Sequence, residues 1–371
     1  MHEFIPVNEP LLCGNEKKYL MQCIDTGWIS SEGEFVRRLE EGMAAYVNRK
    51  YGIAVCNGTA ALDTAIDALE LKVGDEVIMP TFTIISCVIP LVNRGIKPVL
   101  VDVDADTWNM DVSQIESKIT SKTKAIMTVH IYGLPVDMDQ VIELAEKYNL
   151  KVIEDAAEAH GLTYKGKPRG SFGDISIMSF YPNKHITTGE GGIVFTNDDK
   201  IAEKCRSYRN LCFSPERRFK HEHIGFNYRM SNLQAAVGVA QLENIDRHII
   251  MKRKLGASYQ DKLRMQNELK LPISKTSYAD NIYWVFGMVL PNDSSIDAAY
   301  MMEKLKELGI GTRPFFYPMH LQPVFQKKGL FLGEQYPVAE WLAEKGFYVP
   351  SGLTVTEEQI SYVSEQVLKL L

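Results

Sequence analysis

The chain has 371 residues, of which 45% are hydrophobic and 24% charged, and its formal net charge is −6. This composition indicates a soluble globular protein long enough for two domains, and the acidic balance disfavours nucleic-acid binding, which requires clustered positive charge. Residues 1–6 lack the pattern of a secretory signal, and no run of about 18 apolar residues predicts a membrane span. Six scattered cysteines without a CxxC pair predict free thiols rather than a metal site. We therefore expect a cytoplasmic protein that binds no metal, nucleic acid or membrane.

The predicted elements begin with helices and polar turns over residues 15–50, followed by alternating helices and strands. Helices are predicted at 59–71 and 139–148, and short apolar strands at 76–79, 97–101, 124–129, 151–155, 175–179 and 192–196. Short apolar strands separated by helices indicate a parallel or mixed sheet with both faces covered. Ligands of such sheets bind at the carboxyl ends of the strands, so the candidate site residues are those just past each strand end.

The pattern changes beyond about residue 235. A long helix is predicted from 233 to about 263, a strand near 283–290, a helix at 298–308, an extended segment at 312–318 and a last helix from about 356. We predict an α/β chain with a large domain over residues 1–240, which includes the N-terminal helical segment. A smaller C-terminal α+β domain covers residues 241–371.

Two side chains near strand ends suggest pyridoxal phosphate chemistry. Asp155 ends a predicted buried strand, where it is either a helix N-cap or a carboxylate that faces a pyridine nitrogen. Pyridoxal phosphate accepts electrons well only while that nitrogen is protonated. Lys184 lies between a strand and a glycine-rich turn, where an enclosed amine can form a Schiff base and later serve as a general base.

A third feature suits a phosphate group. Residues 57–60 open a predicted helix, whose free N–H groups and positive dipole end favour an anion, and the hydroxyls of Thr59 and Ser179 add donors. Taken alone, this helix start is an ordinary cap, and residues 225–230 are an ordinary turn. Residues 189–192 lack GxGxxG spacing and precede a strand, which disfavours a hydride-transferring dehydrogenase.

In combination, these segments resemble the DegT/DnrJ/EryC1/StrS nucleotide-sugar aminotransferases, a family within the aspartate-aminotransferase fold (fold type I of pyridoxal phosphate enzymes). The resemblance covers nearly the whole chain and rests on residues 57–62, 74–78, 154–161, 179–192 and 225–230. It implies a large domain built on a mixed, mostly parallel sheet with a smaller C-terminal domain. It also implies pyridoxal 5'-phosphate as cofactor, with pyridoxamine phosphate as its intermediate form.

The resemblance also implies residue roles. Lys184 carries the cofactor, Asp155 pairs with its ring nitrogen, and Glu158 lies beside the cofactor and the incoming amine. The implied contacts to the phosphate come from the helix start and the strand end, namely Gly58, Thr59, Ala60 and Ser179. Asn227 reaches the phosphate of the other subunit's cofactor, which implies a homodimer with shared active sites.

Residues 26–31, 186–192 and 313–320 resemble the perosamine-forming subgroup, which aminates carbon 4 of the sugar. The implied sugar or nucleotide contacts are Trp28, Ser30, Tyr317 and His320, and for His320 a structural role is an equal alternative. Two positions depart from the subgroup. Ile84 replaces an aromatic residue that stacks on the cofactor, and Tyr181-Pro182 resembles a related sugar dehydratase that has histidine in place of Lys184.

We expect the amino group of L-glutamate to pass, through the cofactor, to carbon 4 of a 4-keto-6-deoxy sugar on GDP, UDP or dTDP. One alternative is a pyridoxamine-dependent nucleotide-sugar 3-dehydratase, against which Lys184 argues because a covalent anchor competes with persistent pyridoxamine. A second alternative is a catalytically inactive family member that acts as a sensor, against which the intact Lys184 and Asp155 argue.

Overall fold

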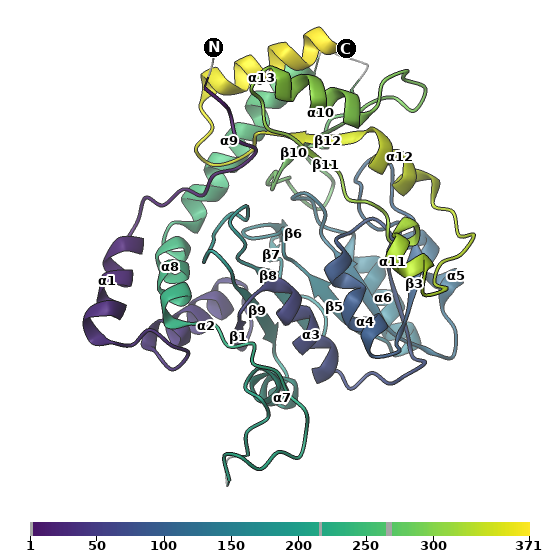
Figure 1. Cartoon of the computed structure of the whole chain (residues 1–371). Helices are drawn as coiled ribbons and strands as arrows, with labels where there is room; N and C mark the ends of the chain where they lie inside the picture. The colour runs from purple at the N-terminus through teal and green to yellow at the C-terminus, as the bar shows by residue number, and fades with distance from the viewer. Residues whose placement is uncertain (1–2, 215–216, 265–268) are drawn as a thin grey trace.

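The computed structural model describes residues 3–214, 217–264 and 269–371, and its centre is a seven-stranded sheet with helices on both faces (Figure 1). The large-sheet strands are β1 (Tyr51–Val55), β2 (Glu76–Pro80), β3 (Lys97–Val101), β4 (Thr123–Val129), β5 (Lys151–Asp155), β8 (Ile175–Ser179) and β9 (Gly192–Thr196). Their order is β1-β9-β8-β5-β4-β2-β3, and β9 alone among them runs opposite to its neighbours. The predicted mixed, mostly parallel sheet is therefore confirmed.

Helices cover the sheet because its strands bury side chains on both faces. One face packs on α3 (Gly58–Ala68), α4 (Ile89–Asn93) and α7 (Asp199–Arg209). The other packs on α2 (Glu34–Tyr46) and α8 (Asn232–Leu242) at one side, and on α5 (Ile115–Lys118) and α6 (Met138–Tyr148) at the other. Successive residues of a strand point to opposite faces, so neighbours such as Ile126 and Met127 belong to different cores.

A smaller unit lies above the sheet in Figure 1 and has a core of its own. It contains the antiparallel sheet β10-β12-β11, with β10 (Phe286–Val289), β11 (Arg313–Pro314) and β12 (Gly346–Val349). Around it lie α10 (Ala298–Glu307), α13 (Glu357–Leu370) and the C-terminal half of α9 (Ile245–Leu263). Ile5 also packs here and bridges to Ile310. The other described elements are α1 (Glu16–Thr26), β6 (Thr163–Tyr164), β7 (Lys167–Pro168), α11 (Pro323–Gln326) and α12 (Pro337–Lys345).

Six predicted strands appear within one residue of their expected ends, whereas β1 was missed. The segment 51–55 is only five residues long and contains Gly52, so its local β signal is weak. Its place is determined by pairing with β9, a contact between residues about 140 apart in the chain. Residues 57–60, the predicted phosphate site, follow the end of β1 almost directly, so the pairing of β1 with β9 also positions that site.

The predicted long helix over 233–263 is wrong, because the chain breaks between α8 and α9. The side-chain nitrogen of Asn244 donates to the carbonyl of Ala240, which would otherwise accept the backbone N–H of Asn244. That N–H bonds Gln241 instead, and Asn244 adopts φ −113° and ψ 5°. The apolar pattern continues on both sides of the break, so periodicity alone does not reveal it.

Two predicted elements are longer than the structure shows. The helix expected over 59–71 ends at Ala68, since Glu70 takes a left-handed φ of 56°. The strand expected near 283–290 is limited to β10, because Tyr283 has φ 49°. Among the described residues, no helix combines the length and apolar character that a bilayer crossing requires.

Candidate active site

A cavity of about 460 Å³ opens at the carboxyl ends of β4, β5 and β8. Seven of the predicted site residues line it: Gly58, Thr59, Ile84, Asp155, Glu158, Ser179 and Lys184. Residues not predicted for the site complete the wall, among them Ser86, Tyr181, Trp284, Phe316 and Tyr348. The fold thus collects side chains from these strand ends, from the start of α3 and from the smaller unit around one space.

Asp155 is the last residue of β5, and its side chain points into the cavity on the face opposite to Glu154. Its Oδ1 accepts the N–H of Ala157 at 2.9 Å, and its Oδ2 lies 3.2 Å from the sulfur of Cys87. Burial raises the pKa of Asp155, while the Ala157 N–H, the Cys87 thiol and Lys184 act in the opposite direction. The two interpretations of Asp155 are compatible, since it caps the following turn and also faces the cavity.

Lys184 lies in the turn between β8 and β9, where its own N–H bonds the carbonyl of Tyr181 at 2.9 Å. Its side chain is only 10% exposed. The Nζ atom is 3.6 Å from Oε1 of Glu158 and 3.8 Å from the centre of the Trp284 ring. Burial lowers the pKa of Lys184, although Glu158 and Asp155 oppose this effect. A buried amine with a lowered pKa is more often neutral, and a neutral amine attacks carbonyl groups.

Glu158 faces Lys184 across the cavity. Its Oε2 accepts the N–H of Tyr132 at 2.9 Å, and its Oε1 is the atom near Lys184 Nζ. Burial raises the pKa of Glu158 to about 7, even though Lys184 favours the charged form. Glu158 thus places a carboxyl group with a raised pKa beside an amine whose pKa is lowered, an arrangement that suits proton transfer between the two.

The start of α3 forms a cradle together with the end of β8. Asn57 caps the helix by accepting the N–H of Ala60 at 2.8 Å, while the first N–H groups of α3 have no helical acceptor. A side chain on Gly58 would come within 2.9 Å of Ser179 Cβ, so glycine allows the strand end to approach. The Thr59 and Ser86 hydroxyl oxygens are 2.9 Å apart beside it. Hydroxyls and helix N–H groups on one concave surface fit a phosphate group.

The remaining predicted site residues do not line the cavity. Ala60 uses its N–H in the helix cap. Trp28, Ser30, Tyr317 and Asn227 are all exposed, Trp28 and Tyr317 by 57% and 51%. His320 is buried, with Nδ1 2.9 Å from the Thr81 hydroxyl and Nε2 3.0 Å from Oε1 of Glu340. Both of its ring nitrogens are thus engaged within the fold.

Several cavity residues escaped the sequence analysis. Trp284 and Tyr348 belong to none of the segments singled out in the sequence, so only tertiary packing brings them to the site. Phe316 lies within the segment 313–320, but it was not named there as a site residue. Cys87 also escaped the sequence analysis. It ends the short helix Ile85–Cys87, and its sulfur lies 3.3 Å from the hydroxyl oxygen of Thr83, four residues earlier in the chain.

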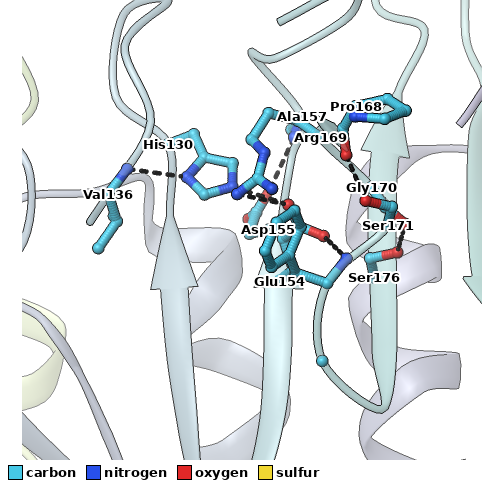
Figure 2. A network of polar contacts seen from close by, with 12 residues as sticks. His130, Val136, Glu154, Asp155, Ala157, Pro168, Arg169, Gly170, Ser171 and Ser176 are labelled. Atoms are coloured by element: carbon cyan, nitrogen blue, oxygen red, sulfur yellow. Dashed lines mark hydrogen bonds and ion pairs between the residues drawn. The ribbon is translucent and has the colours of Figure 1, made fainter. Parts of the chain in front are cut away.

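A buried polar network stands behind Asp155, on the other face of β5 (Figure 2). Nδ1 of His130 accepts the N–H of Val136 at 3.2 Å, so the ring proton is on Nε2, which donates to Oε1 of Glu154 at 2.9 Å. Glu154 also accepts the N–H of Phe172, and Arg169 lies 3.4 Å from its Oε1. Although burial opposes it, Arg169 and His130 lower the pKa of Glu154 to about 2. The network fixes the end of β5, and therefore Asp155, to β4 and to the 168–173 loop.

Replacing Glu154 with alanine should lower the free energy of unfolding by about 3–5 kcal/mol, because Arg169 would remain buried without a counter-charge. Urea unfolding followed by circular dichroism measures the change. The matched control is Glu116→Ala, which removes an exposed ion pair with Lys147 and should hardly move the midpoint. Equal midpoints for the two variants would contradict the anchoring role.

Comparisons with known proteins identify the family of the chain. A sequence model of the DegT/DnrJ/EryC1/StrS aminotransferase family matches residues 11–368. GDP-perosamine synthase of Escherichia coli O157:H7 is 42% identical over 365 residues, which are 98% of this chain and 98% of that protein. An aminotransferase structure from Psychrobacter cryohalolentis has a TM-score of 0.91 at 31% identity, covering 99% of this chain and 98% of the other. The Escherichia coli GDP-4-keto-6-deoxy-D-mannose-3-dehydratase, solved with bound hydrated PLP, has a TM-score of 0.91 at 26% identity, covering 99% and 100%.

Proposed function

Since the chain belongs to the DegT/DnrJ/EryC1/StrS aminotransferase family, we propose that it moves an amino group from L-glutamate to carbon 4 of a nucleotide-linked 4-keto-6-deoxy sugar. The 42% identity to a GDP-perosamine synthase favours a GDP-linked sugar. The observation that carries the proposal is the placement of Lys184, Asp155 and the α3 cradle around one cavity. This is the set of groups that a phosphorylated pyridine aldehyde requires.

Pyridoxal phosphate is the cofactor of this proposal, and when bound it supplies an electron sink through which an amino group and a proton move between carbon atoms. Gly58, Thr59 and Ser179 would hold its phosphate, and Asp155 would keep its ring nitrogen protonated. Lys184 would hold its aldehyde carbon, because its buried amine lines the cavity beside Trp284. Ile84 would cover the ring without an aromatic face.

Proton transfer in this site is assigned to Lys184 and Glu158. The amine of Lys184 would take a proton from one carbon and return it to another, on the far side of the transferred nitrogen. Glu158 holds its carboxyl group 3.6 Å from that amine and stabilises the protonated form. Because the walls include Trp284, Phe316 and Tyr348, the transfer takes place away from bulk water.

Two further features belong to the proposal. The exposed Asn227, together with the exposed Trp28 and Tyr317, supports a homodimer in which Asn227 contacts the partner's cofactor phosphate. A cytoplasmic location fits the supply of L-glutamate and nucleotide sugars.

The competing 3-dehydratase function has a related fold in its favour. Lys184 supports transamination instead, because a covalent lysine link competes with persistent pyridoxamine.

An absorbance spectrum tests the first half of the reaction. The protein loaded with pyridoxal phosphate should show a visible band that disappears with L-glutamate and returns with 2-oxoglutarate. A band that is absent after loading, or that L-glutamate leaves unchanged, would contradict the proposal. A band that responds only to another amino acid would retain the aminotransferase but replace the donor.

Glu158→Gln should shift cofactor uptake to lower pH. Uptake requires the neutral amine of Lys184, and the charge of Glu158 raises the pKa of that amine. Without this charge, the midpoint of the uptake rate against pH should fall, as measured by the growth of the visible band. Glu190→Gln is the control, since Glu190 lines the same cavity but is exposed and should leave the midpoint in place. An unchanged or higher midpoint in Glu158→Gln would refute the pairing of Glu158 with Lys184.

A further inference from the structure

Cys87 contacts the Asp155 carboxylate, although no sequence motif suggested a role for this cysteine. The residue is completely buried and ends the short helix Ile85–Cys87. Its sulfur is 3.2 Å from Oδ2 of Asp155 and 3.3 Å from the hydroxyl oxygen of Thr83. Asp155 and Thr83 are themselves only 2% and 1% exposed, so water does not compete for these contacts.

The direction of the hydrogen bonds follows from the number of protons available. An ionised carboxylate only accepts hydrogen bonds, so the thiol of Cys87 must donate its single proton to Asp155. The sulfur is then left as an acceptor, and the Thr83 hydroxyl donates to it. The result is a directed chain from Thr83 through Cys87 to Oδ2 of Asp155. Burial raises the pKa of the Cys87 thiol, and Asp155 raises it further, so the proton stays on sulfur.

The two oxygens of Asp155 thus receive one donor each from the protein. Ala157 N–H serves Oδ1 and the Cys87 thiol serves Oδ2, which fixes the plane of the carboxylate. Lys184 favours the ionised form of Asp155, whereas Glu158 in the cavity and Glu154 on the other face of β5 oppose it. A buried carboxylate oxygen that lost its donor would be desolvated without compensation, and its proton affinity would rise.

We propose that Cys87 is a positioning residue, whose thiol donates to Oδ2 of Asp155 and keeps that carboxylate ionised and oriented toward the ring nitrogen of the cofactor. The part that concerns the cofactor rests on the proposed function. The contact between the thiol and Asp155 does not, since it exists within this chain alone. A buried cysteine without such a contact acts as a small apolar side chain that fills space in the core.

Two variants at this position separate hydrogen bonding from packing. Cys87→Ala removes the donor, whereas Cys87→Ser keeps one in nearly the same place. The control is Cys205→Ala, which truncates an equally buried cysteine in α7, far along the chain from Asp155. Equilibrium titration with pyridoxal phosphate should show about tenfold weaker binding for Cys87→Ala and near-normal binding for Cys87→Ser and Cys205→Ala. The absorbance of bound cofactor against pH should shift its midpoint in Cys87→Ala alone.

Infrared spectra of the cofactor-free protein give a second, independent readout. The S–H stretching band of Cys87, isolated by subtracting the spectrum of Cys87→Ser, should lie at lower frequency than the Cys205 band, because a charged acceptor forms the stronger bond. Coinciding bands, or equal cofactor affinities for Cys87→Ala and Cys87→Ser, would overturn the proposal. If the wild-type chain takes up no cofactor, the proposed function fails, and the infrared bands still decide whether the thiol donates to Asp155. If Cys87→Ala does not fold, Cys87→Ser and the infrared bands decide in the same way.

Discussion

Lys184→Ala should abolish amino transfer, with turnover reduced by at least about 10²–10⁴-fold, because one substitution removes both the cofactor's anchor and the proton carrier. Among the residues that the structure describes, Lys184 is the lysine that lines the cavity, with its Nζ beside Glu158 and Trp284. The fold should persist, because Lys184 lines a cavity wall, and its truncation enlarges that cavity instead of leaving a gap in a packed core. Borohydride reduction of the loaded wild-type protein, followed by peptide mapping, should place the bound cofactor on Lys184.

The control for this variant is Lys184→Arg. Arginine keeps a positive charge near Glu158 but has no amine that can form a Schiff base, so it should be as inactive as alanine. Activity in Lys184→Arg would show that a positive charge at this position is sufficient for turnover and that no Schiff base is needed. Sustained turnover by Lys184→Ala, or cofactor mapped to another lysine, would refute the assigned role.

Asp155→Asn should lower kcat on the order of 10²–10³-fold, since the amide cannot carry the negative charge that stabilises a protonated ring nitrogen. The amide retains the shape of the carboxylate, and its oxygen can still accept the Ala157 N–H. Stability should therefore change less than activity. Steady-state kinetics and urea unfolding, measured on the same preparation, distinguish the two effects.

Asp174→Asn provides the control for Asp155→Asn. Asp174 accepts the backbone N–H of Val152 at 2.9 Å, at the opposite end of β5 from the cavity. Its substitution should weaken the strand without changing kcat. Equal losses of kcat in both variants would mean that β5 integrity, and not the charge of Asp155, determines the rate.

Much of the large sheet was predictable because each of its inner strands is a short apolar run with a turn on both sides. The ends of β5 and β8 then indicated Asp155 and the turn that contains Lys184, since ligands bind at the carboxyl ends of such strands. The helix start at residues 57–60 had itself indicated a phosphate site. The resemblance to a known family added Glu158. Local sequence was sufficient here because each of these residues lies within a few positions of a strand end or a helix start.

Contacts between distant segments were not predictable in this way. The indole N–H of Trp284 donates to the carbonyl of Asn183 at 2.8 Å, although 101 residues separate them. This bond brings the Trp284 ring beside Lys184, and nothing in the sequence near either residue indicates it. The contact between the Cys87 thiol and Asp155 was equally unpredictable, because Asp155 lies 68 residues further along the chain. The break at Asn244 depends on one side-chain bond that an apolar pattern cannot report.

The most direct test of the central claim is the mass of the product formed from a GDP-linked 4-keto-6-deoxy sugar, with ¹⁵N-labelled L-glutamate and pyridoxal phosphate present. The proposed function predicts a GDP-linked amino sugar that carries the ¹⁵N label in place of the keto oxygen. A 3-deoxy sugar without the label would contradict it and indicate the dehydratase. Unchanged sugar, with the same result for UDP- and dTDP-linked sugars, would contradict it in favour of a binding protein without catalysis.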